Sequence, residues 1–184
     1  MINSNNSNTA LLIIDMINHF QFEHGEQLFE HTNKILLPIL HLKDQAKVKQ
    51  MPIIYINDHY NLWQANFKKI IQVCETNVNK NYISQIAPDE EDYFLIKPKH
   101  SAFYGTALNT LLYHLHIRSL IITGIAGNIC VLFTANDAYM RDYQLYCPKD
   151  CIASADKQDN HYALTMMSHV LKANTSTSTD IALF

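Results

Sequence analysis

Short apolar runs that alternate with longer helical patterns are the feature that most limits the fold of this chain. The runs have the length of strands and cover residues 10–14, 52–56, 93–96, 120–123 and 143–147. Apolar residues recur at helical spacing over residues 32–49, 65–75, 106–116, 128–141 and 157–173. Strands that alternate with helices form a parallel sheet with crossover helices on both faces. We therefore predict an α/β fold of three layers, with a doubly wound and mostly parallel sheet.

The remaining stretches set the size of the sheet and the number of domains. Residues 175–183 are rich in Thr and Ser and are predicted to add a sixth strand, whereas the polar residues 75–91 read as a long surface connection. No repeat and no Pro/Gly-rich linker divides the chain, and its 184 residues suit one hydrophobic core. We expect residues 1–184 to form a single domain.

Charge and the N-terminal residues exclude several classes of partner. The net charge is −3 and no basic run is present, which argues against nucleic acid. Residues 1–8 are polar without a positively charged region, and the apolar run after them is too short to cross a bilayer. We expect a cytoplasmic protein with no membrane partner, reduced cysteines and a small molecule as its ligand.

Polar residues follow three of the apolar runs and a glycine follows a fourth, at the points where the predicted strands end. Asp15 follows the first run, Asn57 and Asp58 the second, Lys97 the third and Gly124 the fourth. Ligands of an open parallel sheet bind beyond the carboxyl ends of its strands. Any one of these residues could be a solvated strand end, but together they predict a site at this edge.

The strongest local signal is the segment from Gly124 to Cys130. The chain has only 4 glycines, and Gly124 and Gly127 both lie in this segment, between a predicted strand and a predicted helix. The pattern puts Cys130 in the first turn of that helix, where free N–H groups and the helix dipole can lower a thiol pKa and hold an oxyanion. The alternative is a buried packing role, which we expect for Cys74, Cys147 and Cys151.

A nucleophilic thiol needs a group that takes its proton and later protonates the leaving amine. Asp15 is the candidate for this role. Spacing alone puts Asp15, Lys97 and Cys130 at the same edge of the sheet and does not show that they meet.

Three ordered motifs extend this reading: Ala-Leu-Leu-Ile-Ile-Asp-Met at 10–16, Lys-Pro-Lys-His-Ser-Ala-Phe-Tyr-Gly-Thr at 97–106, and Gly-Ile-Ala-Gly-Asn-Ile-Cys at 124–130, continued by Thr-Ala-Asn-Asp-Ala at 134–138. In this order they resemble the isochorismatase-like cysteine hydrolases, which include nicotinamidases and N-carbamoylsarcosine amidase. The resemblance implies a six-stranded sheet and a triad of Asp15, Lys97 and Cys130. It also implies a cis peptide between Ile125 and Ala126 that aims the Ala126 and Cys130 N–H groups into an oxyanion hole.

By this resemblance the reaction is hydrolysis of a small amide or carbamoyl compound through a Cys130 thioester, without a cofactor and in a homo-oligomer. The residues after Asp15, Met-Ile-Asn-His-Phe, depart from the Met-Gln-Asn-Asp-Phe of many relatives. Asp58 and His59 match only part of the nicotinamidase metal site, so we predict no metal, and nicotinamide is a less favoured substrate. Candidates for the substrate pocket are Phe20, Asp58, Trp63, Phe103 and Tyr104.

Two other functions remain open from the residues. One is hydrolysis of the ether bond of an isochorismate-like acid, and the other is a flavodoxin-like module that binds a ligand without chemistry. The module is less favoured because the chain has all three triad residues and no phosphate loop. Neither alternative needs the Cys130 thiol, so a Cys130→Ala variant separates them from the amidase.

Overall fold

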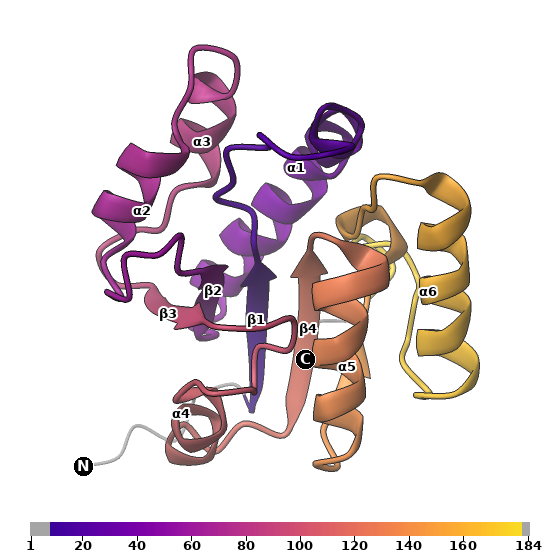
Figure 1. The fold of residues 1–184 in the computed structure, drawn as a ribbon. Helices are drawn as coiled ribbons and strands as arrows, with labels where there is room; N and C mark the ends of the chain where they lie inside the picture. The colour runs from indigo at the N-terminus through magenta and orange to yellow at the C-terminus, as the bar shows by residue number, and fades with distance from the viewer. Residues whose placement is uncertain (1–7, 182–184) are drawn as a thin grey trace.

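The computed structural model describes residues 8–181, and its centre is a parallel sheet covered by helices on both faces (Figure 1). The strands in this part of the chain are β1 (Thr9–Ile14), β2 (Ile53–Asp58), β3 (Tyr93–Lys97), β4 (Ser119–Gly124) and β5 (Gln144–Tyr146). They lie in the order β3-β2-β1-β4-β5, and every neighbouring pair is parallel. The predicted α/β class and doubly wound arrangement are confirmed.

Helices divide between the two faces of the sheet. One face is covered by α1 (Gly25–Val48), α2 (Phe67–Cys74) and α3 (Lys80–Ile86), and the other by α4 (Leu108–His114), α5 (Leu132–Tyr139) and α6 (Lys157–His169). Two short turns complete the structure, a π-helical turn at Gly127–Val131 and a 3-10 turn at Lys149–Cys151. Among residues 8–181 no helix is both long and apolar enough to cross a membrane.

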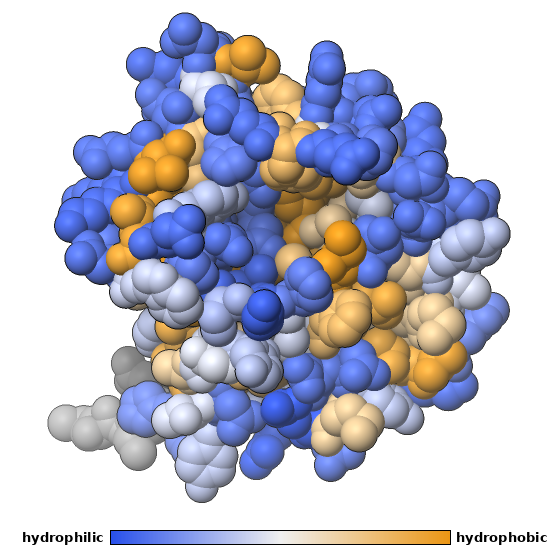
Figure 2. Space-filling view, in the orientation of Figure 1, coloured by the Kyte–Doolittle hydropathy of each residue, from blue (hydrophilic) through white to orange (hydrophobic). Residues whose placement is uncertain are grey.

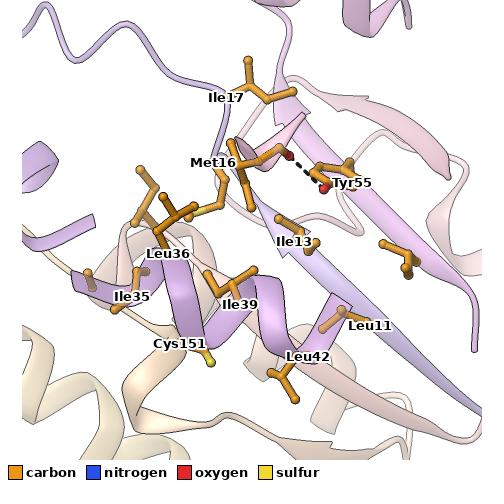
Figure 3. Close-up of a cluster of buried hydrophobic side chains, with 14 of the residues drawn as sticks. Leu11, Ile13, Met16, Ile17, Ile35, Leu36, Ile39, Leu42, Tyr55 and Cys151 are labelled. Atoms are coloured by element: carbon orange, nitrogen blue, oxygen red, sulfur yellow. Dashed lines mark hydrogen bonds between the residues drawn. The ribbon is translucent and has the colours of Figure 1, made fainter. Parts of the chain in front are cut away.

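The three central strands β1, β2 and β4 are buried on both faces, which is why they read as unbroken apolar runs. Alternate residues point to opposite sides, so Leu11 and Ile13 belong to the core under α1 while Leu12 and Ile14 belong to the core under α4, α5 and α6. Figure 3 shows the α1 side, where Tyr55 also donates a hydrogen bond to the carbonyl of Ile86 at 2.8 Å. The residues of α1 that pack there share one helical stripe: Ile35, Leu36, Ile39 and Leu42.

The predicted sixth strand is wrong for the residues that the structure describes. Asn174 forms a single parallel bridge with Tyr146, and no strand follows it up to residue 181. The chain turns away because the Asn174 side chain accepts the Ser176 N–H (2.9 Å) and because Asp150 binds the backbone and hydroxyl of Ser178. Residues 182 and 183 of the predicted strand lie outside the described part.

The polar stretch 75–91 is not a plain surface connection, since α3 lies within it. Tyr82, Ile83 and Ile86 are buried at the spacing of one helix face. Asn79 ties the segment down, accepting the Thr76 N–H (2.7 Å) and donating to the carbonyl of Asn18 (2.9 Å). The helix was missed because its apolar face has only three residues among many asparagines.

Chain order in the sheet reverses between β1 and β4. The crossover from β1 runs outward to β2 and β3, and the chain then returns to place β4 on the other side of β1. Such a reversal leaves a crevice beyond the carboxyl ends of the two central strands. The segments that follow Ile14 and Gly124 border this crevice.

Candidate active site

Three side chains meet beyond the ends of β1, β3 and β4. The Lys97 ammonium lies 2.8 Å from Oδ2 of Asp15 and donates to Sγ of Cys130 at 3.4 Å. The side chains of Lys97 and Asp15 are only 3% and 9% exposed, so water screens their attraction weakly. The structure thus brings together the three residues that the sequence placed only at a common edge.

Asp15 is held from both sides. Its backbone has a positive φ of 52° and its N–H donates to the carbonyl of Ile56 at 3.0 Å. The carboxylate accepts the backbone N–H of Asp58 at 2.9 Å through Oδ1, which leaves Oδ2 for Lys97. The next residues are anchored by Asn57, whose amide exchanges two hydrogen bonds with the backbone of Ile17. Asp15 therefore has one fixed orientation.

The segment before Cys130 needs both of its glycines. Gly124 has φ 114°, and a Cβ there would lie 2.1 Å from the carbonyl oxygen of Ile14. A Cβ on Gly127 would lie 2.3 Å from Oδ1 of Asn160. Between them the peptide from Ile125 to Ala126 is cis, as the family resemblance implied.

Cys130 lies in a π-helical turn and not in the first turn of an α-helix. The Val131 N–H reaches back to the carbonyl of Ala126 at 3.1 Å, and α5 begins only at Leu132. The wider turn adds one residue before the helix and is a common feature of functional sites. The prediction that a helical segment begins here was right, but the first turn is π-helical and not α-helical.

Polar contacts join the Lys97 motif to the Cys130 motif. Ser101 donates to the carboxylate of Asp137, and the Ala102 N–H donates to Oγ1 of Thr134 at 2.9 Å. Thr134 in turn donates to the carbonyl of Cys130 at 2.7 Å. These residues belong to the motifs at 97–106 and 134–138, and no role was predicted for them. The available signal was Thr134, a polar residue at a core-facing position of the helix.

The surroundings of Cys130 oppose the expected lowering of its thiol pKa. Burial and the carboxylate of Asp15 raise the pKa of Cys130 to about 12, although Lys97 acts in the lowering direction. Burial would lower the pKa of Lys97, but Asp15 and Cys130 outweigh it and raise the pKa. At neutral pH the resting site therefore holds a protonated thiol beside an ammonium group. The prediction of a lowered thiol pKa is wrong for this resting state.

The cluster opens on a cavity of about 820 Å³ that lies over the crevice between β1 and β4. Asp15, Ala126 and Cys130 line it, and Figure 2 shows the hollow with hydrophilic and apolar groups side by side inside it and a mainly hydrophilic rim. Within residues 8–181, the half-buried Ala126 N–H donates to no other group. A thiol, a carboxylate and a free amide donor thus face one solvent-accessible space.

Residues 9–180 match the Isochorismatase domain family. The chain belongs to the isochorismatase family.

Relatives and solved structures agree with this assignment. The isochorismatase family protein YaaI of Bacillus subtilis (strain 168) is 61% identical over 172 residues, which cover 94% of this chain and 95% of that protein. The N-carbamoylsarcosine amidase of Thermoplasma acidophilum has a TM-score of 0.72 at 26% identity, over 95% of this chain and 98% of that one. The nicotinamidase of Staphylococcus aureus has a TM-score of 0.68 at 23% identity, over 92% and 98%. The family resemblance seen in the motifs is confirmed, and this isochorismatase-family protein is a hydrolase.

None of the five predicted pocket residues of this hydrolase lines the cavity. Phe20 packs against Phe29 and Tyr82 in the core under α1, and Phe103 lies in the opposite core. Trp63 and Tyr104 are 66% and 61% exposed on the surface. Asp58 accepts the Tyr60 N–H at 2.8 Å. The apolar walls come from other positions, namely Phe22, Leu28, Ile125, Ile129 and Ala155.

Asp58 and His59 are both engaged elsewhere. The His59 ring stacks on Trp63 with 3.9 Å between centroids, and its Nδ1 accepts the Asn61 N–H at 3.0 Å. Within the described residues no three His, Cys, Asp or Glu side chains converge as metal ligands would.

Proposed function

We propose that this hydrolase cleaves the C–N bond of a small amide or carbamoyl compound through a thioester on Cys130, with Asp15 and Lys97 as the other catalytic residues. The supporting observation is the contact chain from the Asp15 carboxylate through the Lys97 ammonium to the Cys130 sulfur, at the floor of the cavity. A buried ion pair needs no thiol for its stability. The presence of one there favours nucleophilic chemistry.

The first half of the reaction transfers the acyl group to sulfur. Asp15 takes the proton of the Cys130 thiol as sulfur attacks the carbonyl carbon, and a C–S bond forms. The N–H groups of Ala126 and Cys130 donate to the oxygen that becomes negative, while Lys97 stabilises the charge that passes between Asp15 and the sulfur. The C–N bond then breaks, and the protonated Asp15 gives its proton to the leaving nitrogen.

The second half releases the acid. Water enters in place of the amine, Asp15 takes one of its protons, and the resulting hydroxide attacks the thioester carbon. The C–S bond breaks, and the sulfur recovers its proton from Asp15. A raised thiol pKa fits this cycle, because the thiolate is then formed during attack and is a good acceptor of the returning proton.

The experiment is ammonia release from a panel of small amides that differ in charge: glycinamide, propionamide and succinamate. We expect wild-type protein to hydrolyse at least one of them and Cys130→Ala to lose more than about 10³-fold of that rate. Equal measurable rates for the two proteins would contradict the role of Cys130, and no hydrolysis of any amide by the wild type would leave ether hydrolysis or simple binding.

A matched control separates loss of the nucleophile from loss of fold. Cys147 is fully buried under the opposite sheet face, in the core with Leu145 and Ala173, and lines no cavity wall near Cys130. A Cys147→Ala variant should therefore keep the wild-type turnover. Mass spectrometry of the Cys130 variant should show no acyl adduct after rapid quenching, whereas wild type should show one.

The cytoplasmic location and the homo-oligomer expected from sequence stay predictions. Size-exclusion chromatography with light scattering tests the second, and cell fractionation tests the first. The small-molecule ligand fits a hydrolase whose nucleophile sits below a cavity of this size.

A further inference from the structure

The charged groups that line the cavity are almost all acidic. Asp15, Glu23, Asp156 and Asp159 supply four carboxylates, and the lining residues include no Lys or Arg. Asp15 is balanced by Lys97 behind it. The other three carboxylates form the rim, which we call the acidic rim.

Two members of the acidic rim have no cationic partner within the described residues. Asp156 accepts the backbone N–H groups of Gln158 and Asp159 at 2.7 and 2.9 Å, as the N-cap of α6. Asp159 accepts the side-chain amide of Asn128 at 3.3 Å. Neither carboxylate forms an ion pair in residues 8–181, so no side-chain cation lies against either of them at the cavity.

The cations nearest in sequence do not cancel this charge. Glu23 faces His24, whose Nε2 lies 3.7 Å away and is charged only when protonated. Lys157 stands between the two rim aspartates in sequence, but it does not line the cavity.

We propose that the substrate is a cationic amide, whose positive group lies against the acidic rim while its carbonyl reaches Cys130. This inference rests on the proposed function, because it takes the cavity as the substrate site. The partly exposed ring of Phe22 also lines the cavity and offers a cation a second favourable contact. An isochorismate-like acid or any other carboxylate would meet like charges at the rim.

The test measures the charge preference of Cys130 itself and needs no turnover. The protein reacts at mildly alkaline pH with three methanethiosulfonates that differ in charge: trimethylammonioethyl, methyl and sulfonatoethyl. The Cys130 thiolate attacks the thio sulfur, an S–S bond forms, the S–S bond to the sulfonyl group breaks, and methanesulfinate leaves. Mass spectrometry gives the rate, and each rate is divided by that of free mercaptoethanol.

We expect the cationic reagent to label Cys130 about tenfold faster than the anionic one at low salt after this correction, and the difference to shrink strongly in about 1 M salt. The double variant Asp156→Asn with Asp159→Asn should bring the ratio of the cationic to the anionic labelling rate to within about threefold of the ratio for the free thiol. Asparagine keeps the cap of α6 and the contact with Asn128, so only the charge is removed. The matched control is Asp44→Asn with Glu91→Gln, which removes the same charge from exposed positions outside the cavity. It should leave the ratio unchanged.

A wild-type ratio equal to that of mercaptoethanol would overturn the inference, as would a preference that survives the rim variant or disappears in the control. Fastest hydrolysis of succinamate in the amide panel would overturn it as well. Failure of the proposed function looks different. In that case no amide is hydrolysed, while the labelling preference and its loss in the rim variant are still measured.

Discussion

Two buried lysine–carboxylate pairs in this molecule have similar geometry and different surroundings. Lys97 lies 2.8 Å from Asp15, and Lys43 lies 3.2 Å from Asp92, with all four side chains less than a tenth exposed. Lys43 also binds Asp89 at 3.1 Å and the carbonyl of Ala87 at 2.9 Å, and lies over the ring of Tyr55. None of these contacts of Lys43 is with a group that changes its charge in the proposed reaction.

Lys97 differs in its third neighbour, which is the thiol of Cys130. That group gains and loses a charge during the proposed reaction, and the Asp15 carboxylate beside it opens on the cavity. The Lys43 pair joins α1 to the residues before β3 and lines none of that cavity. A buried ion pair alone therefore does not mark an active site. A titratable third group and access to substrate make the difference.

The largest expected effect comes from neutralising the acid in each pair. Asp15→Asn should reduce amide hydrolysis by about 10³-fold or more, because it removes the group that takes the thiol proton. Asp92→Asn should leave turnover near the wild-type value. Steady-state rates of the two variants decide the matter, and a comparable loss of activity in both would mean that the pairs are not functionally distinct.

Removing the lysines gives the next largest effect, and here stability separates the pairs. Lys43→Met leaves the Asp92 carboxylate buried without its cation and should lower the free energy of unfolding by about 3 kcal/mol. Turnover per folded molecule should not change. Lys97→Met should instead abolish turnover. Urea denaturation and activity on the same samples measure both, and an inactive, fully folded Lys43→Met protein would break the comparison.

A smaller effect concerns the thiol pKa. The Asp15 carboxylate raises the pKa of Cys130, so Asp15→Asn should lower it from about 12, and below that pKa each unit of decrease raises the thiolate fraction about tenfold. Labelling of Cys130 by iodoacetamide at fixed alkaline pH should therefore become faster in a protein that has lost its activity. Lys97→Met should shift the pKa upward and slow labelling. Asp92→Asn is the control, and its labelling profile should coincide with that of wild type.

The sequence predicted the edge of the sheet at which Asp15, Lys97 and Cys130 lie, because strand ends are visible in a pattern. Asp15 and Lys97 each stand at the end of an apolar run, and parallel strands bring such residues to one edge. Cys130 was recognisable from the two glycines before it. The structure explains why glycine is needed there, because a Cβ on Gly124 or Gly127 would lie too close to neighbouring atoms. Strand ends and glycines at close approaches can both be recognised from the sequence alone, without knowledge of side-chain contacts.

The cavity wall was not predictable in this way. Phe22, Asp156 and Asp159 belong to segments whose place depends on how α1 and α6 pack, and no local pattern carries that information. Conversely, Phe20 and Phe103 are aromatic residues in or near the motifs, but their side chains are buried in the two hydrophobic cores and do not reach the cavity. The thiol pKa was mispredicted for a related reason, since the dipole of a helix start was visible in the sequence but the depth of burial beside Asp15 was not.

The smallest expected effect compares one hydrogen bond on each side of the sheet. Tyr55→Phe removes the bond to the Ile86 carbonyl, and Thr134→Val removes the link between the Ala102 N–H and the Cys130 carbonyl. Each should cost about 1 to 2 kcal/mol of unfolding free energy, because a buried partner is left unpaired. Only Thr134→Val should also reduce turnover, by several fold, since it loosens the contact that holds the Lys97 segment against the turn of Cys130. Urea denaturation with steady-state kinetics tests this, and equal kinetic losses in both variants would show that turnover follows stability alone.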